Sequence, residues 1–396
     1  MKAWSLEAVI DPVSAEDFFS AYFESQRLLV RRNRPDYFEE LLTLDDVDRI
    51  LTTAQPTRDE VAVVNAANKI KTADYVYGND RVKVDQLFRL HEAGGTIILN
   101  HLHRRHPPLA RLCAALELEF SAPFQTNIYL TPARAQGFHP HFDTHDVLVL
   151  QLAGSKRWQL YGTPVELALK GHGDHARQDN PGPVSEEFDL RAGDTLYIPR
   201  GLVHEAISTD ETSLHVTVGV LSWTWFDFLL EAVKRLASSD GHVRAALPPA
   251  FARPDCDPGA FSKAFTELAG RLATEVDANE IRKGFAERFI DRRPPFLRHQ
   301  MRALTQIGDI GLDSVVGCRP FLAYLIDEDE ASLILRFHRN EIAVPLHAGP
   351  AVRHALTTER FRVRDLPGDL DDAGKLVLVR RLIREGLLQP LDQTQI

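Results

Sequence analysis

The spacing of apolar residues divides this chain into two parts. Between residues 121 and 222, short segments are either apolar throughout or alternate apolar with polar positions, which is typical of strands in a packed β-structure. The predicted strands cover residues 127–130, 147–152, 157–161, 195–198 and 214–220. The stretch 163–189 is rich in Gly, His and Pro and has no sustained period, so we expect long loops there.

The preceding part, up to about residue 120, mixes helical and strand patterns and is expected to flank the β-structure. Helices are predicted at 15–24, 44–53 and 107–116, and short strands at 28–31, 61–64 and 96–99. His101, His103 and His106 cluster here beside two arginines. We expect these histidines on a solvated surface rather than in a second metal site.

From Trp223 the apolar period becomes about 3.6 residues, which predicts helices. One apolar face comprises Phe226, Leu229, Leu230, Val233 and Leu236, and another comprises Phe261, Phe265, Leu268 and Leu272. Large aromatic residues on helices outside a β-structure need burial. Either the adjacent domain or a second copy of the chain can supply it.

The C-terminal part begins after the linker-like segment Arg292-Arg-Pro-Pro-Phe296. A strand pair (332–337 and 341–346) and two helices (349–359 and 369–385), with a strand after Gly386, give a winged-helix outline. Acidic residues crowd the start of the second helix, where a DNA reader would meet phosphates, so an interaction module without direct DNA binding is expected. The predicted domains are 1–222, 223–312 and 313–396.

Composition narrows the class of protein. Of the 396 residues, 44% are hydrophobic and 26% are charged, as in ordinary globular proteins, and the net charge of −10 favours basic partners over nucleic acid. The three cysteines, Cys113, Cys256 and Cys318, have no paired spacing, which fits a reducing compartment. Without a signal sequence or an apolar run of about eighteen residues, we expect a cytoplasmic protein without membrane insertion.

Candidate metal ligands stand at the head of the apolar run 147–152. His141 and Asp143 are two residues apart, so on a strand both side chains leave the same face and can bind one ion. His139 and His145 are rival ligands. Because Pro140 suits an edge or entry position, we place His139 outside the ligand set.

A third ligand is predicted at His204. It ends the pattern G-x5-P-x-G-x2-H that starts at Gly193, which is the second signature of the cupin barrels, jelly rolls with a narrow cavity between facing strands. His204 can therefore reach His141 and Asp143. Two imidazoles and one carboxylate leave coordination positions open, as in non-haem Fe(II) oxygenases and unlike closed structural zinc sites.

With these residues in place, the sequence resembles the JmjC-type ribosomal oxygenases, a family of cupin-like hydroxylases of ribosomal proteins that depend on iron and 2-oxoglutarate. The resemblance spans nearly the whole chain. Its motifs occur in the family's order: Asn127-Ile-Tyr129-Leu-Thr-Pro132, His141-Phe-Asp143, Gln151-Leu-Ala-Gly154-Ser-Lys156-Arg-Trp158 and Leu196-Tyr-Ile-Pro199-Arg-Gly201-Leu-Val-His204-Glu-Ala.

The resemblance implies an α+β fold: a double-stranded β-helix, then a helical dimerisation region and a winged-helix-like domain. It also implies that Lys156 binds the distal carboxylate of 2-oxoglutarate, with Tyr129 as a hydroxyl donor and Asn127 as a polar neighbour. A dicarboxylate in an apolar barrel needs such a cation. His215 and Thr217 share one face of the last strand and match polar positions common in the family. We expect them either to line the pocket wall or, as an equal alternative, to form a buried hydrogen-bonded pair.

The implied activity is hydroxylation of a histidine or arginine side chain in a basic ribosomal protein, by a homodimer using Fe(II) and 2-oxoglutarate. Lysine at position 156 resembles the histidine-hydroxylating members, since the bacterial arginine-hydroxylating members carry arginine there. No catalytic residue beyond the metal ligands is required. Three other interpretations are a hydroxylase that tailors a peptide natural product, a cupin iron enzyme that does not use 2-oxoglutarate, and a non-enzymatic adaptor.

Overall fold

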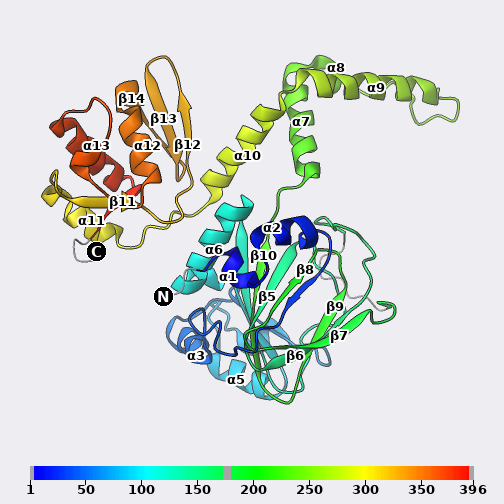
Figure 1. The fold of residues 1–396 in the computed structure, drawn as a ribbon. Helices are drawn as coiled ribbons and strands as arrows, with labels where there is room; N and C mark the ends of the chain where they lie inside the picture. Colours follow the sequence, from blue (N-terminus) through cyan, green and yellow to red (C-terminus); the bar gives the residue numbers. More distant parts are fainter. Residues whose placement is uncertain (1–3, 173–179, 392–396) are drawn as a thin grey trace. The chain divides into compact units, whose positions relative to one another are not determined.

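The computed structural model describes residues 4–172 and 180–391, and the chain forms two compact units, Met1–Ser222 and Trp223–Ile396. The first unit is built on two antiparallel β-sheets (Figure 1). The larger has the strand order β1-β8-β5-β10-β4-β3-β2, and the smaller has the order β7-β6-β9. The strands are β1 (Leu28–Val30), β2 (Val61–Val64), β3 (Thr96–Asn100), β4 (Phe124–Thr131), β5 (Asp146–Ala153), β6 (Ser155–Leu160), β7 (Glu186–Arg191), β8 (Thr195–Ile198), β9 (His204–Ser208) and β10 (Ser213–Val220).

A layer of apolar side chains joins the two sheets. Val147 and Val149 of β5 pack with Trp158 and Leu160 of β6, and Phe188 of β7 completes the contact. Facing antiparallel sheets around one core are the jelly roll that was predicted for this part of the chain. The five strands predicted between residues 121 and 222 are confirmed, with small shifts at their ends.

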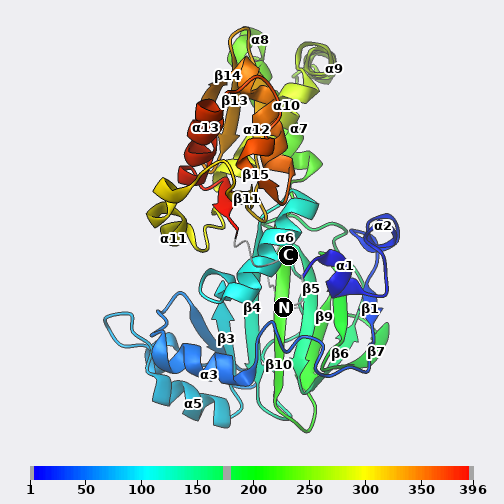
Figure 2. The same cartoon turned by 60° about the vertical axis from the view of Figure 1, so that its left-hand side comes forward.

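Helices cover the opposite face of the larger sheet, where apolar residues of α1, α3, α5 and α6 join the buried side chains of β5 and β10 in the main core. The helices of this unit are α1 (Leu6–Ile10), α2 (Ala15–Asp17), α3 (Leu44–Thr53), α4 (Thr72–Tyr75), α5 (Val84–Glu92) and α6 (Pro107–Phe120). Strand β10 lies between β5 and β4 (Figure 2), and Val216 and Val218 on one of its faces are fully buried in that core. Its alternation therefore sends His215 and Thr217 to the opposite face, toward the smaller sheet.

Two elements differ from the sequence-based expectations. The helix expected at 15–24 is only the short α2 followed by a π-helical turn at Phe18–Tyr22, and this wider turn brings Phe18 and Phe23 against Tyr197. The loop expected at 163–189 ends early, because β7 begins at Glu186. Residues 173–179 of that loop lie outside the described residues.

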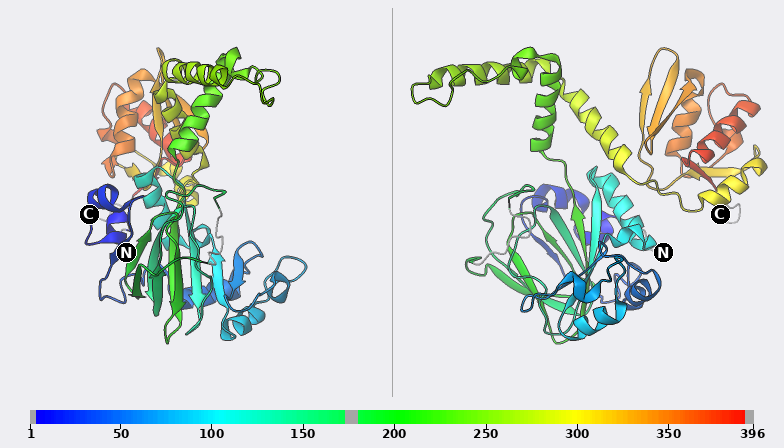
Figure 3. Two further views of the ribbon diagram at one scale, coloured as in Figure 1. Left: turned by 90° about the vertical axis from the view of Figure 1, so that its right-hand side faces the viewer. Right: turned by 180° about the vertical axis from the view of Figure 1, so that it is seen from behind.

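The second unit begins with helices and ends in a mixed domain, drawn in orange and red in Figure 3. Its helices are α7 (Trp225–Ser239), α8 (Gly241–Arg244), α9 (Pro258–Glu275), α10 (Ala278–Arg292), α11 (Gln300–Thr305), α12 (Gly349–Thr357) and α13 (Asp372–Arg384). Strands β12 (Leu325–Glu328), β13 (Ser332–Phe337) and β14 (Asn340–Pro345) form one antiparallel sheet, and β11 (Val315–Cys318), β15 (Phe361–Arg362) and β16 (Leu388–Pro390) form another. Thus the predicted strand pair and both predicted C-terminal helices are present.

Every helix in the described ranges is too short or too polar to cross a bilayer. The helical region exposes apolar residues instead of burying them all. Trp225 on α7 is 78% exposed and Phe265 on α9 is 73% exposed, and α9 buries none of its residues.

Candidate metal centre

A pair of backbone hydrogen bonds brings two of the predicted metal ligands together. The amide of His204 donates to the carbonyl of His141 at 2.8 Å, and the amide of His141 donates back at 3.1 Å. This exchange is an isolated bridge, so the expectation that His141 and Asp143 lie on a regular strand is wrong. Pro140 has no amide hydrogen to donate to a ladder, and β5 begins only at Asp146.

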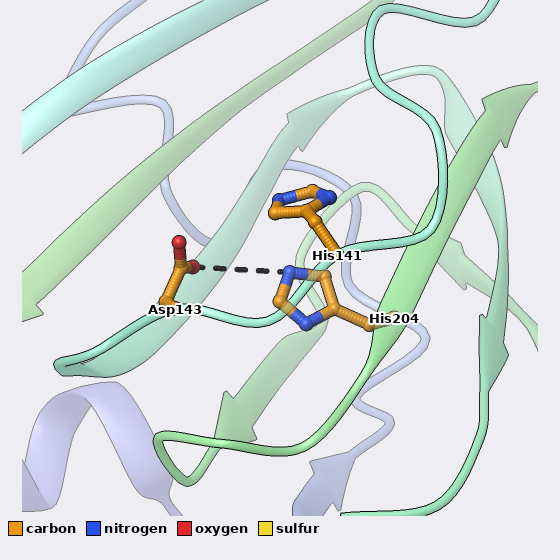
Figure 4. Close-up of side chains that lie close together, drawn as sticks. All are labelled: His141, Asp143 and His204. Carbon is orange, nitrogen blue, oxygen red and sulfur yellow. Dashed lines mark ion pairs between the residues drawn. The ribbon is translucent and has the colours of Figure 1, made fainter. Parts of the chain in front are cut away.

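The three side chains converge at one point (Figure 4). One ligand atom from each of His141, Asp143 and His204 lies within 4.8 Å of the others, and Nε2 of His204 is 3.8 Å from Oδ2 of Asp143. The imidazole centroids are 4.6 Å apart. This spacing suits three donors around one ion, and the set of two nitrogens and one oxygen suits a divalent transition metal.

Both histidines are oriented by main-chain carbonyls. The Nδ1 atom of His141 lies 2.8 Å from the carbonyl oxygen of His139, and Nδ1 of His204 lies 3.0 Å from that of Leu202. A carbonyl accepts only, so each Nδ1 carries the proton and each Nε2 offers a lone pair. Metal-binding histidines are commonly held in this way. His139 therefore contributes its carbonyl to the site.

The ligands face a cavity between the two sheets. Lys156, Tyr129, His215 and Thr217 line the same cavity, together with apolar side chains that include Val149. Asn127, in contrast, does not line it: its side-chain oxygen accepts the amide of His101 at 3.3 Å. The structure thus brings the other predicted site residues together in the cavity, and Asn127 lies just outside it as a polar neighbour whose side chain hydrogen-bonds Tyr129.

Lys156 is buried in β6, where it is only 4% exposed, and it does not lie in a solvated turn. Its neighbour Arg157 points outward and pairs with Asp189 at 2.9 Å. Burial lowers the pKa of Lys156 to about 7, and no described carboxylate offsets the effect. A buried ammonium without an anionic partner is destabilising, so this position favours an anionic ligand.

Aromatic rings form the remaining walls. Tyr129 stacks on His215 with centroids 4.8 Å apart and planes at 5°. Burial raises the pKa of Tyr129, as does the charge of Asp143, while burial lowers the pKa of His215 well below its usual value, assisted by the charge of Lys156. Tyr129 therefore keeps its hydroxyl proton and His215 is neutral.

Two residues of the cavity wall, Trp158 and Phe138, were not predicted from the sequence. The ring centroid of Trp158 lies 5.9 Å from that of His204, and the ring centroid of Phe138 lies 5.4 Å from that of His141. Trp158 follows Lys156 by two positions along β6, so both side chains leave the same face of the strand. Once the lysine is known to point inward, the tryptophan is expected in the cavity as well.

The separate histidine cluster is not a solvated surface, which corrects that expectation. His106 is buried and its Nε2 lies 2.8 Å from the carbonyl oxygen of Leu41. Burial lowers the pKa of His103 to about 4, and its ring contacts Thr126. His103 therefore contacts β4 of the larger sheet, and His106, which directly precedes α6, contacts the turn before α3.

A jelly roll that holds two histidines and an aspartate in its cavity belongs to the class of cupin-type metal-dependent proteins. Residues 99–228 match the JmjC domain family. Ribosomal oxygenase 2 of Bos taurus is 32% identical over 331 residues, which cover 78% of this chain and 70% of that protein. The chain therefore belongs to the ribosomal oxygenases of the JmjC type, and the resemblance noted from the motifs is confirmed.

Other relatives match over a shorter part. The bifunctional lysine-specific demethylase and histidyl-hydroxylase NO66 of Dictyostelium discoideum is 33% identical over 58% of this chain, which spans only 45% of that protein. Among solved structures, Escherichia coli YcfD, a ribosomal oxygenase in complex with cobalt and succinic acid, has a TM-score of 0.56 at 16% identity and covers 96% of this chain and 99% of its own. That likeness supports the fold.

The buried lysine predicts an unusual dependence of stability on pH. The unfolded chain keeps the Lys156 proton up to the ordinary pKa of 10.5, whereas the folded protein releases it near pH 7. Between these values the folded state binds fewer protons, so its stability rises with pH. Lys156→Met should therefore raise the free energy of unfolding of the ligand-free protein at and below pH 7, and this gain should disappear as the pH approaches 10.5.

Denaturant unfolding across this pH range measures the effect. Lys69→Met, at an exposed position of the same unit, is the control and should show no such trend. A destabilising, pH-independent effect of Lys156→Met would contradict the burial of an uncompensated charge.

Proposed function

We propose that this protein is an Fe(II)- and 2-oxoglutarate-dependent oxygenase that hydroxylates a histidine or arginine side chain of a ribosomal protein. The observation that carries the proposal is the convergence of His141, Asp143 and His204 in a cavity that also contains the buried Lys156. A metal triad alone fits many cupins. The added buried cation suits a dicarboxylate cosubstrate and argues against a cupin enzyme that does without 2-oxoglutarate.

The residues fit the proposed metal and cosubstrate. The two Nε2 lone pairs and one carboxylate would hold Fe(II) on one face, and the Lys156 ammonium would bind the distal carboxylate of 2-oxoglutarate. Bound Fe(II) and 2-oxoglutarate, together with O2, would supply oxidative hydroxylation of the substrate, with release of succinate and CO2. Trp158 and Val149 exclude water from the cavity, and Tyr129 offers a hydroxyl proton.

A polypeptide substrate is supported by a groove beside the cavity. It is lined by residues from β2 and the segment after it, including Asn65 and Lys69, and it shares Gly137, Phe138 and His141 with the cavity. An open approach of this kind admits a side chain on an extended chain. The net charge of −10 favours a basic partner. The histidyl-hydroxylase name of one relative favours histidine over arginine as the target.

We also infer a homodimer formed through residues 223–312, because α7 and α9 expose apolar side chains that a second copy would cover. Residues 313–396 would form a winged-helix-like module that does not bind DNA. On α13, Lys375 donates to the carbonyl of Arg364 and Arg380 donates to the carbonyl of Ile310. Arg381 pairs with Glu385, so these three cations are already engaged within the chain. The free cysteines are in keeping with a cytoplasmic location.

The proposed activity is tested by the mass of the host's ribosomal proteins. A strain lacking the gene should lose one oxygen atom, about 16 Da, from one ribosomal protein, and the wild-type gene should restore it. Asp143→Ala should fail to restore it, because removal of one ligand from a three-ligand site leaves too few donors to retain the ion. His139→Ala is the matched control and should restore it, since its contribution is a main-chain carbonyl. Full restoration by Asp143→Ala would refute the metal site.

The cosubstrate assignment predicts a separable effect of Lys156. Lys156→Ala should raise the concentration of 2-oxoglutarate needed for half-maximal turnover by roughly tenfold to a hundredfold, because a charge-assisted contact contributes about 1.5–3 kcal/mol. Arg157→Ala, which removes the adjacent outward-facing cation, should leave this requirement unchanged. The measurement is CO2 or succinate release against 2-oxoglutarate concentration. Equal values for the two variants would remove Lys156 from the cosubstrate site.

The assembly is tested by light scattering on a size-exclusion column. The wild-type protein should elute with a mass near twice 44.6 kDa, and Phe265→Asp should reduce it toward the mass of one chain, because a charge would be buried at the interface. Val377→Asp, at a 69% exposed position on α13, serves as the control. A wild-type monomer, or equal loss of mass in both variants, would contradict assembly through α9.

A further inference from the structure

A buried ion pair joins the two chain segments that carry the candidate metal ligands. Asp146, the first residue of β5, is 0% exposed, and Arg200, in the turn between β8 and β9, is 7% exposed. Nη1 of Arg200 donates to Oδ2 of Asp146 at 2.7 Å. Asp146 follows Asp143 by three residues, and Arg200 precedes His204 by four.

Two further residues complete the network. The hydroxyl of Tyr197 donates to Oδ1 of Asp146 at 2.7 Å and accepts the amide of Glu24 at 2.8 Å. The carboxylate of Glu24 also pairs with Arg200 at 2.5 Å. One guanidinium therefore bridges two carboxylates that come from distant parts of the chain, so its position is fixed from both sides.

Two consecutive main-chain amides connect this network to the segment that carries Asp143. The amide of Arg200 approaches Oδ1 of Asp146 at 3.4 Å, and the amide of the next residue, Gly201, donates to the carbonyl of Asp143 at 2.9 Å. Gly201 has a φ of +90°, and a Cβ there would lie 2.0 Å from the carbonyl oxygen of Val165. The turn is thus tightly held, and His204 enters β9 from it to meet His141.

A buried ion pair is a weak source of stability, because the desolvation of both charges offsets most of their attraction. Its characteristic contribution is a defined geometry. In this barrel, the apolar core between the sheets and under the helices already supplies the burial that stabilises the unit. The pair lies where geometry matters most, between the segments that carry Asp143 and His204.

We propose that Asp146 and Arg200, with Tyr197 and Glu24, are positioning residues that set the separation of Asp143 and His204 for metal binding. This inference rests on the proposed function, because it requires that the triad binds a metal ion. A second buried carboxylate gives a comparison. Asp194 is 4% exposed and accepts the amides of Arg32 and Arg191 at 2.9 and 3.1 Å, in the turn before β8.

The experiment is a titration of the metal-free, full-length protein with Co(II). The visible absorption of the bound ion monitors binding at each addition. Asp146→Asn and Arg200→Met should each weaken Co(II) binding by about tenfold or more, as expected for residues that orient metal ligands, and should change the absorption bands. Asp194→Asn should lower the melting temperature of the metal-free protein but leave Co(II) affinity and spectrum unchanged.

The outcomes separate this inference from the proposed function. If the wild-type protein binds no Co(II), the metal site fails and the inference fails with it. If the wild-type protein binds Co(II) and both pair variants bind it equally well with the same spectrum, only the positioning role is refuted. Equal weakening by Asp194→Asn would also refute it, since loss of affinity would then follow general destabilisation.

A milder variant keeps the test decisive if both pair variants fail to fold. Tyr197→Phe removes a single hydroxyl from Asp146 and keeps the aromatic ring that packs on Phe18. It should weaken Co(II) binding and shift the spectrum in a folded protein. A folded Tyr197→Phe protein with wild-type affinity and spectrum would overturn the proposal.

Discussion

The structure of the first unit depends on placing polar side chains between two β-sheets without losing the core that holds the sheets together. Strand alternation solves this problem, because consecutive residues point to opposite faces. On β10 the buried Val216 and Val218 pack under the helices, while His215 and Thr217 face the cavity. On β6 the cavity face carries Lys156 and Trp158. The core between the helices and the larger sheet buries most of the apolar side chains, so part of the space between the two sheets can hold ionisable groups.

The membership in the ribosomal oxygenases agrees with two local features of the cavity, the orientation of the histidines and the buried lysine. A barrel that had become a passive adaptor would have no need for two histidines held by carbonyls in the tautomer that binds metal. It would also have no need for a lysine buried without a carboxylate, which destabilises the free protein. A tailoring enzyme for peptides would share both features. The match over 78% of the chain to a ribosomal oxygenase is the observation that supports the proposed ribosomal substrate over a peptide natural product.

Much of this architecture could be predicted from local sequence. The period of two identified the central strands, and the spacing of His141, Asp143 and His204 identified residues that the fold brings together. What the sequence could not show depends on tertiary contacts. Strand β7 was not predicted because it lies in a polar stretch where only Phe188 and Leu190 are apolar and face the core. The inward direction of Lys156 depends on the register with which β6 pairs to its neighbours. The Asp146–Arg200 pair links residues that are 54 positions apart.

The separation of core and cavity side chains on opposite faces of β10 has an evolutionary consequence. Because the core side chains and the cavity side chains occupy alternate positions, a substitution at 215 or 217 changes the pocket without removing a core contact. Selection can therefore alter specificity at these positions independently of selection for stability, which acts on 216 and 218. Related barrels can therefore diverge in pocket chemistry through substitutions at every second residue of one strand, while the fold stays constant.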